Sequence, residues 1–380
     1  MLIGWVAAGK VSRLRVSRES VRTAQYLCWR RLRTGQIRPT PCLQVRRRCR
    51  YLGTSADRRP KLLGQAEGEG NMSSNIPMSE YTYIDPASMR PGRKEMFPSL
   101  FSSPAEVRLT VVVPAYNEEA RLPAMMDEAL AFLEKWGEED NSFTYEIIVA
   151  NDGSRDKTAL VALEYTKRFS AQKVRVLSLA QNAGKGVAVK KGIMAARGAV
   201  ILFCDADGAT RFADLSILYR QLELIARDQQ ADSLENAHAC VIGSRYHLKS
   251  SAERSLVREF VSRVFNLYVQ YVGGVRGVRD TQCGFKLFTR RSAQLIFPCM
   301  HLDRWAFDVE ALYIAQAHCV AISEVPVQWM EIPGSKLSVV KASLNMARDM
   351  ALMRWNYLTG VWSAGVPDLA HVGTQSNKFP

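Results

Sequence analysis

Short apolar runs rich in β-branched residues recur along the chain from residue 109 onward. They are "LTVVV" (109–113), "YEIIVA" (145–150), "KVRVLSL" (173–179), "AVILFC" (199–204) and "ACVIG" (239–243). Each run has the length and composition of a strand. Apolar residues at helical spacing from Leu122 to Leu133 separate the first two runs, and a segment from Gly184 to Arg197 separates the third from the fourth. Strands that alternate with helices predict an α/β fold with a mostly parallel sheet.

Polar and small residues follow the first four predicted strands. The loops read "PAYNEE" (114–119), "NDGSRDKT" (151–158), "AQNAGKG" (180–186) and "DADGATRF" (205–212). Because parallel strands end at one edge of a sheet, we expect these loops to converge. Neither a G-x-G-x-x-G fingerprint nor a P-loop follows the first strand. Asp205 and Asp207 instead place two carboxylates after a buried strand, which predicts a Mg²⁺ or Mn²⁺ site shared with phosphate oxygens.

Most of the positive charge lies at the N-terminus. The net charge is +14, and residues 1–60 hold fifteen Lys or Arg residues against only Glu19 and Asp57. The rest of the chain is nearly neutral, so its charge gives no reason to expect nucleic-acid binding. We expect residues 1–96 to form a basic, disordered leader because they show no strand or helix periodicity. A mitochondrial transit peptide, or sequence upstream of a start at Met72 or Met78, would have the same composition.

Membrane contact is expected to be peripheral. The chain has no run of 18 consecutive apolar residues, and its eight cysteines include no C-x-x-C pair, which favours a reducing compartment without a zinc site. Residues 254–272 and 341–357 each combine an apolar stripe with basic residues. Such a stripe is typical either of a helix at a membrane interface or of a helix packed on a sheet. We favour the interface for the first segment, and both readings stay open for the second.

The four loop sequences, in this order and spacing, resemble the family-2 glycosyltransferases of GT-A fold. Further along, "GSRYHL" (243–248), "RGVRDTQCGFKLF" (276–288) and "DRWAFDVEALYIAQ" (303–316) resemble the dolichyl-phosphate β-glucosyltransferases of the endoplasmic reticulum. The resemblance covers about residues 97–362 and departs from the family at Asn151, where an aspartate is usual. It also departs at the N-terminus, where the family usually has a membrane-spanning anchor and this sequence has the basic leader.

The resemblance implies a GT-A-type, Rossmann-like sheet flanked by helices, with amphipathic C-terminal helices. We expect a glycosyltransferase domain at 97–362, with a nucleotide-sugar half at 109–245, an acceptor and membrane-facing half at 246–362, and a flexible tail at 363–380. The implied reaction transfers glucose from UDP-glucose to dolichyl phosphate, at the endoplasmic reticulum membrane with the catalytic domain facing the cytosol. A dolichyl-phosphate mannosyltransferase that uses GDP-mannose, or a non-catalytic sugar-nucleotide-binding subunit, are the alternatives.

The resemblance also assigns roles on the donor side. The residues implied to line the nucleotide pocket are Pro114, Ala115, Tyr116 and Glu118. Asp152 is implied to accept hydrogen bonds from the uracil or ribose, and Asp205 and catalytic Asp207 to hold the metal against the diphosphate. Lys185 either contacts a phosphate or is a solvated lysine in the first turn of a helix. Taken singly, Asp207 would be favoured to open a turn with Gly208, and Asp152 to cap the helix after Ser154.

On the acceptor side, the resemblance implies fixed positive charge. Dolichyl phosphate is already ionised at neutral pH, so no strong base is required. Arg245 is the principal candidate to bind this phosphate, and the further candidates are Arg258, Arg263, Arg279 and Lys286. Asp308 is assigned a positioning or base role. Trp305 and Phe307 beside it fit core residues equally well, with Asp308 capping the helix that follows.

Overall fold

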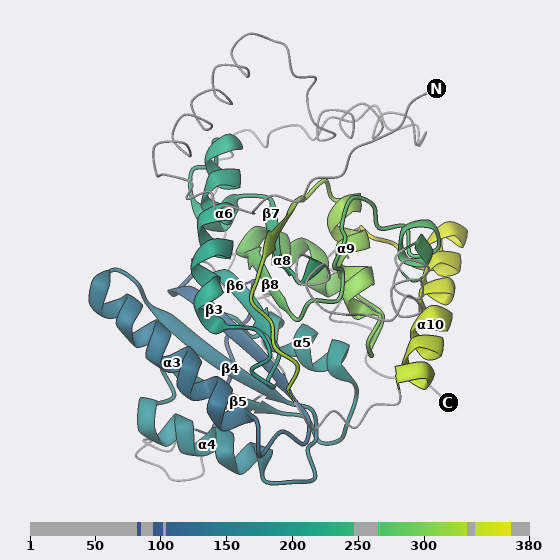
Figure 1. The fold of residues 1–380 in the computed structure, drawn as a ribbon. Coiled ribbons are helices and arrows are strands. Elements are labelled where there is room, and N and C mark those ends of the chain that lie inside the picture. The colour runs from purple at the N-terminus through teal and green to yellow at the C-terminus, as the bar shows by residue number, and fades with distance from the viewer. Residues whose placement is uncertain are drawn as a thin grey trace, which may run out of the picture. The chain divides into compact units, whose positions relative to one another are not determined.

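The computed structural model describes residues 82–84, 94–101, 104–246, 265, 267–332 and 339–365 (Figure 1). The basic segment at residues 1–60 lies outside the described residues. So do most of the predicted helix at 254–272, including Arg258 and Arg263, and most of the predicted tail.

Seven strands of the described residues form one sheet in the order β5-β4-β3-β6-β8-β7-β9. They are β3 (Val107–Ala115), β4 (Tyr145–Asn151), β5 (Val174–Ser178), β6 (Gly198–Cys204), β7 (Ala239–Ser244), β8 (Phe285–Thr289) and β9 (Ala321–Pro326). All five predicted strands are confirmed as β3 to β7. The pairs among β3, β4, β5 and β6 are parallel, as is the pair of β7 with β9, whereas β8 is antiparallel to both β6 and β7. The sheet is therefore mostly parallel, as predicted, with one unpredicted antiparallel strand inserted into it.

Helices cover both faces of this sheet (Figure 1). They are α3 (Leu122–Glu139), α4 (Thr158–Phe169), α5 (Lys185–Met194), α6 (Leu215–Asp228), α8 (Arg290–Ile296), α9 (Phe307–Ala317) and α10 (Val339–Thr359), with short 3₁₀ turns at Phe212–Asp214, Leu234–Asn236 and Phe297–Cys299. Side chains of α3, α4 and α6 share one apolar cluster with the sheet, and those of α5, α8, α9 and α10 share the other. Because both faces are covered, β4 is buried at every position, which explains its continuous apolar run.

The predicted apolar stripe at 341–357 packs inward. Met350 and Met353 of α10 are fully buried in the cluster that includes α9, and Met346 and Tyr357 are partly buried against it. For this stripe, packing on the core is the correct reading.

Two short strands precede residue 97, where no strand was predicted. β1 (Thr82–Ile84) and β2 (Lys94–Met96) pair antiparallel. The rings of Tyr83 and Phe97 lie 5.0 Å apart, and the Arg175 guanidinium lies 5.3 Å from the first ring and 5.0 Å from the second. The predicted boundary at 97 is therefore too late. Strands of three residues are too short for an alternating pattern to reveal them.

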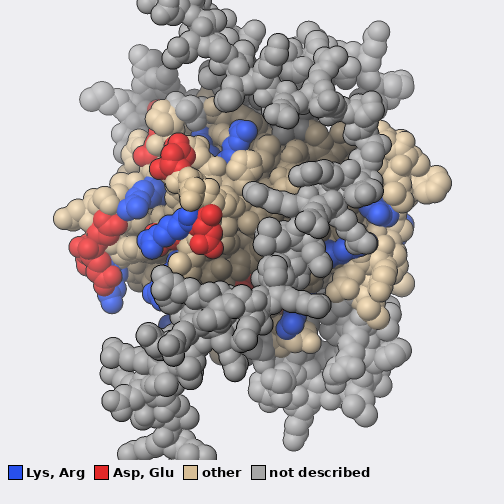
Figure 2. Space-filling view, turned by 90° about the horizontal axis from the view of Figure 1, so that it is seen from above, with Lys and Arg blue, Asp and Glu red and all other residues tan. Residues whose placement is uncertain are grey.

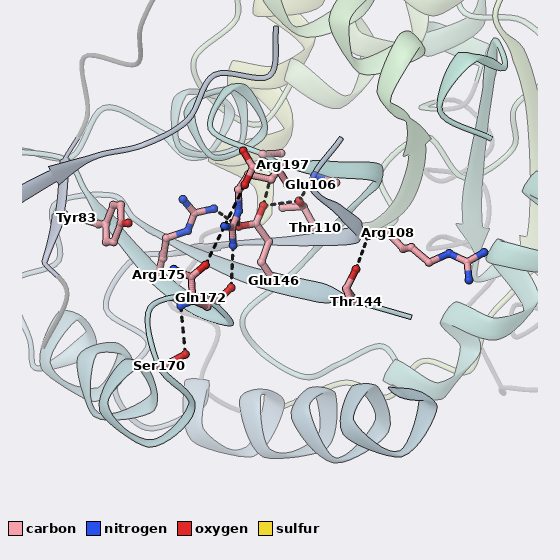
Figure 3. Close-up of polar contacts among 12 residues, drawn as sticks. Tyr83, Glu106, Arg108, Thr110, Thr144, Glu146, Ser170, Gln172, Arg175 and Arg197 are labelled. Atoms are coloured by element: carbon pink, nitrogen blue, oxygen red, sulfur yellow. Dashed lines mark hydrogen bonds and ion pairs between the residues drawn. The ribbon is translucent and has the colours of Figure 1, made fainter. Parts of the chain in front are cut away.

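A buried charge network lies at the amino edge of the sheet (Figure 3). Glu146 is fully buried and accepts hydrogen bonds from Thr110 Oγ1 at 2.6 Å, from Arg197 N at 2.8 Å and from Arg197 Nε at 2.9 Å. The guanidinium of Arg175, which is only 2% exposed, also donates to Glu146. A buried carboxylate is stable only with such partners, and these come from β3, β5 and the start of β6. The network therefore joins four neighbouring strands at the edge opposite the polar loops.

Candidate active site

The polar loops meet at the carboxyl edge of the sheet, as predicted. Asp152 N, which follows β4, donates to Ala115 O at 2.9 Å. In the loop after β3, Asn117 N donates to Ser154 Oγ at 3.0 Å and Glu118 N donates to Thr158 Oγ1 at 2.8 Å. These bonds fix the first two loops against each other, and the ends of β6 and β7 lie along the same edge.

Asp152 organises the loop that leads into α5. Its Oδ1 accepts from Ala183 N at 2.8 Å, and its Oδ2 accepts from Gly184 N at 2.9 Å and from Asn182 Nδ2 at 2.9 Å. Burial raises the pKa of Asp152, and the two backbone donors partly oppose this rise. Because both of its carboxylate oxygens already accept hydrogen bonds from protein groups, Asp152 holds residues 182–184 in place in this structure.

The departure from the family at Asn151 leaves the turn intact. Asn151 Oδ1 accepts from Ser154 N at 3.2 Å, and Asn151 Nδ2 lies 3.3 Å from Ser178 Oγ on β5. An aspartate would keep the first of these bonds but lacks the amide donor of the second.

The two aspartates after β6 have different partners. Lys185 Nζ, from the first turn of α5, lies 2.6 Å from Asp205 Oδ1. Asp207 Oδ1 accepts from Ala209 N at 3.0 Å, which is the turn contact expected of an aspartate before glycine. Burial alone would lower the pKa of Lys185, but the charges of Asp205 and Asp308 raise it. Lys185 is therefore a paired lysine at the site, and the reading as a solvated surface residue is wrong.

A third carboxylate strengthens the negative field here. Burial raises the pKa of Glu118, the ion pair with Arg121 at 2.5 Å opposes this rise, and the charges of Asp207 and Asp205 add to it. Of the predicted pocket residues Pro114, Ala115, Tyr116 and Glu118, the first two are buried and Tyr116 is exposed. Tyr116 is thus the one of these four whose side chain is most open to a ligand.

The donor set suits a divalent cation that substrate phosphates help to bind. Among the described residues, no cluster of three or more His, Cys, Asp or Glu side chains could hold a metal alone. Mg²⁺ and Mn²⁺ sites commonly use one or two carboxylates together with phosphate oxygens, and Asp205 and Asp207 supply that number. The residues present therefore fit the predicted cation.

Arg245 follows β7 and is paired with a buried acid. Its Nε and Nη2 donate to Asp280 at 2.8 Å each, and its backbone N donates to Asp280 Oδ2 at 2.9 Å. Burial would raise the pKa of Asp280, but the hydrogen bonds and charge of Arg245 outweigh burial and lower it. The sequence assigned Arg245 to the acceptor phosphate and predicted no partner for it. The structure adds Asp280 as that partner, and the role of Arg245 at the acceptor phosphate stays a prediction.

The other predicted cations have different environments. Lys286 is 1% exposed and donates to Asp308 Oδ1 and to Cys283 O, at 2.5 Å each, so it is no open phosphate ligand. Arg279 is exposed, with its guanidinium 5.1 Å from the Tyr246 ring. Lys286 is buried because α9, which carries Asp308, packs on this face of β8.

Asp308 lies in the first turn of α9 and is buried. Burial raises its pKa, whereas the charges of Lys286 and Lys185 lower it. Beside it, Phe307 is a core residue, as one reading had it, but Trp305 is 41% exposed and its ring lies 5.1 Å from Lys185 Nζ. The core reading is therefore wrong for Trp305, which covers the lysine that contacts Asp205.

Sequence reasoning missed two partners at this edge, Asp280 and Gly284. Asp280 lies 35 positions after Arg245, and no local pattern indicates an ion pair at that separation. Gly284 O accepts from Asp205 N at 3.0 Å. Both belong to "DTQCGFKLF", a stretch recognised in the sequence without roles for these two residues.

Comparison with known proteins supports the resemblance seen in the sequence. Residues 110–247 match the model of the glycosyl transferase family 2. The dolichyl-phosphate beta-glucosyltransferase of Homo sapiens is 49% identical over 71% of this chain and 82% of its own length, and that of Saccharomyces cerevisiae is 37% identical over 68% and 77%. The structure of glucosyl-3-phosphoglycerate synthase from Mycobacterium tuberculosis with UDP has a TM-score of 0.47 at 19% identity, over 67% of this chain and 82% of that chain.

Proposed function

Because this chain belongs to the dolichyl-phosphate β-glucosyltransferase family, we propose that it transfers glucose from UDP-glucose to dolichyl phosphate. The observation that carries the proposal is the position of Asp205 and Asp207 beside Lys185, at the edge where the donor loops meet. Carboxylates with one adjacent cation suit a nucleotide diphosphate bound through a divalent metal.

On the donor side, we assign the metal-binding role to Asp205 and Asp207. A bound Mg²⁺ or Mn²⁺ would stabilise the negative charge that grows on UDP as the bond to the sugar breaks. Lys185 lies at 2.6 Å from Asp205, where its ammonium group can contact the same diphosphate. Tyr116, in the loop after β3, is exposed and is the proposed contact for the base or ribose. Asp152 serves the nucleotide indirectly by fixing residues 182–184.

On the acceptor side, the lipid phosphate is its own nucleophile. Because it is ionised at neutral pH, it can attack the anomeric carbon without a general base, and one in-line displacement gives the β-linked product. Arg245 fixes the loop around Asp280, and the side chain of Arg245 is 30% exposed. Arg279, next to Asp280 in the sequence, is an exposed cation. Asp308 is assigned a positioning role with Lys286, since the reaction needs no base from it.

The lipid acceptor requires a membrane surface, and one side of the described residues suits it. None of the described helices is long and apolar enough to span a bilayer. The exposed large apolar residues of α10 and the turn after it are Leu344, Leu352, Trp355, Leu358 and Val361. Leu267 and Tyr271 of the predicted interfacial segment are exposed too, and Tyr268 Oη donates to Ala347 O at 2.9 Å, so this segment adjoins α10.

Helix α10 therefore presents large apolar side chains to the core and also to the outside, where Arg348 is exposed as well. Several large apolar side chains exposed on one element are typical of an interaction site. On the side where α10 lies, the described surface in Figure 2 is mostly uncharged with isolated basic groups. This pattern suits the headgroup region of an anionic bilayer. We propose that this surface rests on the cytosolic face of the endoplasmic reticulum membrane.

A transfer assay tests the proposal. Purified protein is given radiolabelled UDP-glucose or GDP-mannose together with dolichyl phosphate in detergent, with Mg²⁺, with Mn²⁺, or with EDTA. We expect labelled lipid from UDP-glucose and a divalent ion only. Transfer from GDP-mannose instead would favour the mannosyltransferase alternative. Nucleotide binding that is independent of metal, without any transfer, would favour a non-catalytic subunit.

A further inference from the structure

The turn that enters β8 lies directly against the first metal-site aspartate. Cys204 pairs with Phe285 in the antiparallel ladder of β6 and β8. Immediately before that pair, Asp205 N donates to Gly284 O at 3.0 Å. The backbone of residue 284 is therefore held beside Asp205 by the sheet itself, and the two residues cannot move apart without loss of ladder bonds.

Residue 284 is a glycine, and the Asp205 carboxylate occupies the space that a side chain at this position would fill. A β-carbon at this position would lie 2.1 Å from Asp205 Oδ2 and 2.3 Å from Asp205 Cγ. Non-bonded heavy atoms normally approach to about 3.5 Å, so the carboxylate and a methyl group cannot share this space.

The backbone conformation does not require glycine here. The φ angle of Gly284 lies outside the left-handed region, so an alanine could adopt it without backbone strain. The nearest obstacle to a methyl group is thus a functional side chain. That side chain is itself held on its Oδ1 by Lys185 at 2.6 Å.

We propose that Gly284 is a positioning residue for the metal centre, because the absence of its side chain provides the space in which the Asp205 carboxylate lies. This inference rests on the proposed function, in which Asp205 and Asp207 hold the cation. A methyl group at 284 displaces the carboxylate from Lys185 and separates it from Asp207, while the strand that carries it stays in place.

The first test compares Gly284→Ala with a matched control, Gly137→Ala. Gly137 lies within α3, and a β-carbon there would meet only Phe143 O at 3.8 Å. Mn²⁺ binding in the presence of UDP is measured by electron paramagnetic resonance titration. We expect Gly284→Ala to weaken Mn²⁺ binding roughly 10- to 100-fold, as is usual when the support of a metal ligand is lost. Gly137→Ala should bind Mn²⁺ like the wild type.

The second test is a double-mutant cycle on thermal stability. Gly284→Ala is introduced into the wild type and into Asp205→Ala, where no carboxylate occupies the space. We expect Gly284→Ala to lower the midpoint of unfolding in the wild type and to have little effect in the Asp205→Ala background. A separate structural role for Gly284 would lower the midpoint equally in both backgrounds.

The outcomes separate this inference from the function beneath it. Unchanged Mn²⁺ affinity in Gly284→Ala, or equal stability effects in both backgrounds, overturns the positioning role. A wild type that neither binds Mn²⁺ nor transfers glucose overturns the proposed function. In that case the stability cycle still decides whether Gly284 makes room for Asp205.

Discussion

Replacement of Glu146 by glutamine should destabilise the fold strongly without changing the catalytic step. Glu146 is fully buried and is the shared acceptor for Arg175, Arg197 and Thr110 (Figure 3). Glu146→Gln keeps the shape of the side chain but removes its negative charge. It also turns an NH₂ group toward neighbours that are themselves donors.

The size of the effect follows from what remains around Arg175. This guanidinium is 2% exposed, and its Nε has no hydrogen-bond partner among the described residues. The rings of Tyr83 and Phe97 stay in place, but such cation–π contacts contribute only about 0.5–2 kcal/mol. Leaving a buried charge without its partner costs about 3–5 kcal/mol. We therefore expect the free energy of unfolding to fall by about 3–5 kcal/mol, a large part of the roughly 5–15 kcal/mol typical of a folded domain.

Urea unfolding followed by circular dichroism measures this loss. The control is Glu146→Gln combined with Arg175→Met, which removes both buried charges and should recover part of the stability. Below the unfolding temperature, kcat should match the wild type, because Glu146 and Asp152 lie six strand residues apart, or about 20 Å. The reasoning is refuted if the single variant loses less than about 1 kcal/mol. It is equally refuted if the folded variant loses transfer activity.

Four further outcomes are expected. Asp207→Ala should abolish transfer but leave the unfolding midpoint nearly unchanged, because this side chain ends in a turn outside the core; wild-type rates at saturating Mg²⁺ or Mn²⁺ would contradict the metal assignment. The lowered pKa of Asp280 means that its pair with Arg245 stabilises the fold above about pH 4 and is lost as the pH falls through the folded-state pKa. The difference in unfolding free energy between wild type and Asp280→Asn should therefore be constant from about pH 5 to 7 and shrink below about pH 4. Trp355→Ser should reduce flotation with anionic vesicles, with Leu160→Ser, an exposed apolar residue on α4, as the control that floats normally. The anomeric proton of the product should show a β linkage by NMR, and an α-linked product would exclude a single displacement.

The alternating strands and their polar loops were predictable because each signal is local. β3 to β6 are largely buried, mostly apolar runs of five to nine residues, and each of the four polar loops is contiguous in the sequence. β8 escaped prediction because its five residues include Lys286, which a strand pattern assigns to a solvent face. The structure buries Lys286 by pairing it with Asp308, 22 positions later. A partner this far along the sequence can bury a charged residue that the local pattern assigns to the surface.

The partners of the site residues could not be predicted for the same reason, and they lie in one stretch of the chain. In the turn before β8 and in its first residues, Asp280 binds Arg245, Gly284 makes room for Asp205, and Lys286 holds Asp308.

This arrangement follows from topology. β8 runs antiparallel between β6 and β7, so the chain enters it at the same edge where those two strands end. The antiparallel strand that the α/β pattern did not predict, with the turn before it, thus contacts both the proposed metal ligand Asp205 and the proposed acceptor residue Arg245. It follows that substitutions within 280–286 should affect the proposed metal site through Gly284 and the proposed acceptor site through Asp280, whereas substitutions in the loop after β4 should affect the nucleotide. The stretch "DTQCGFKLF" is therefore the part of the sequence in which a change of sugar or lipid specificity should be sought first.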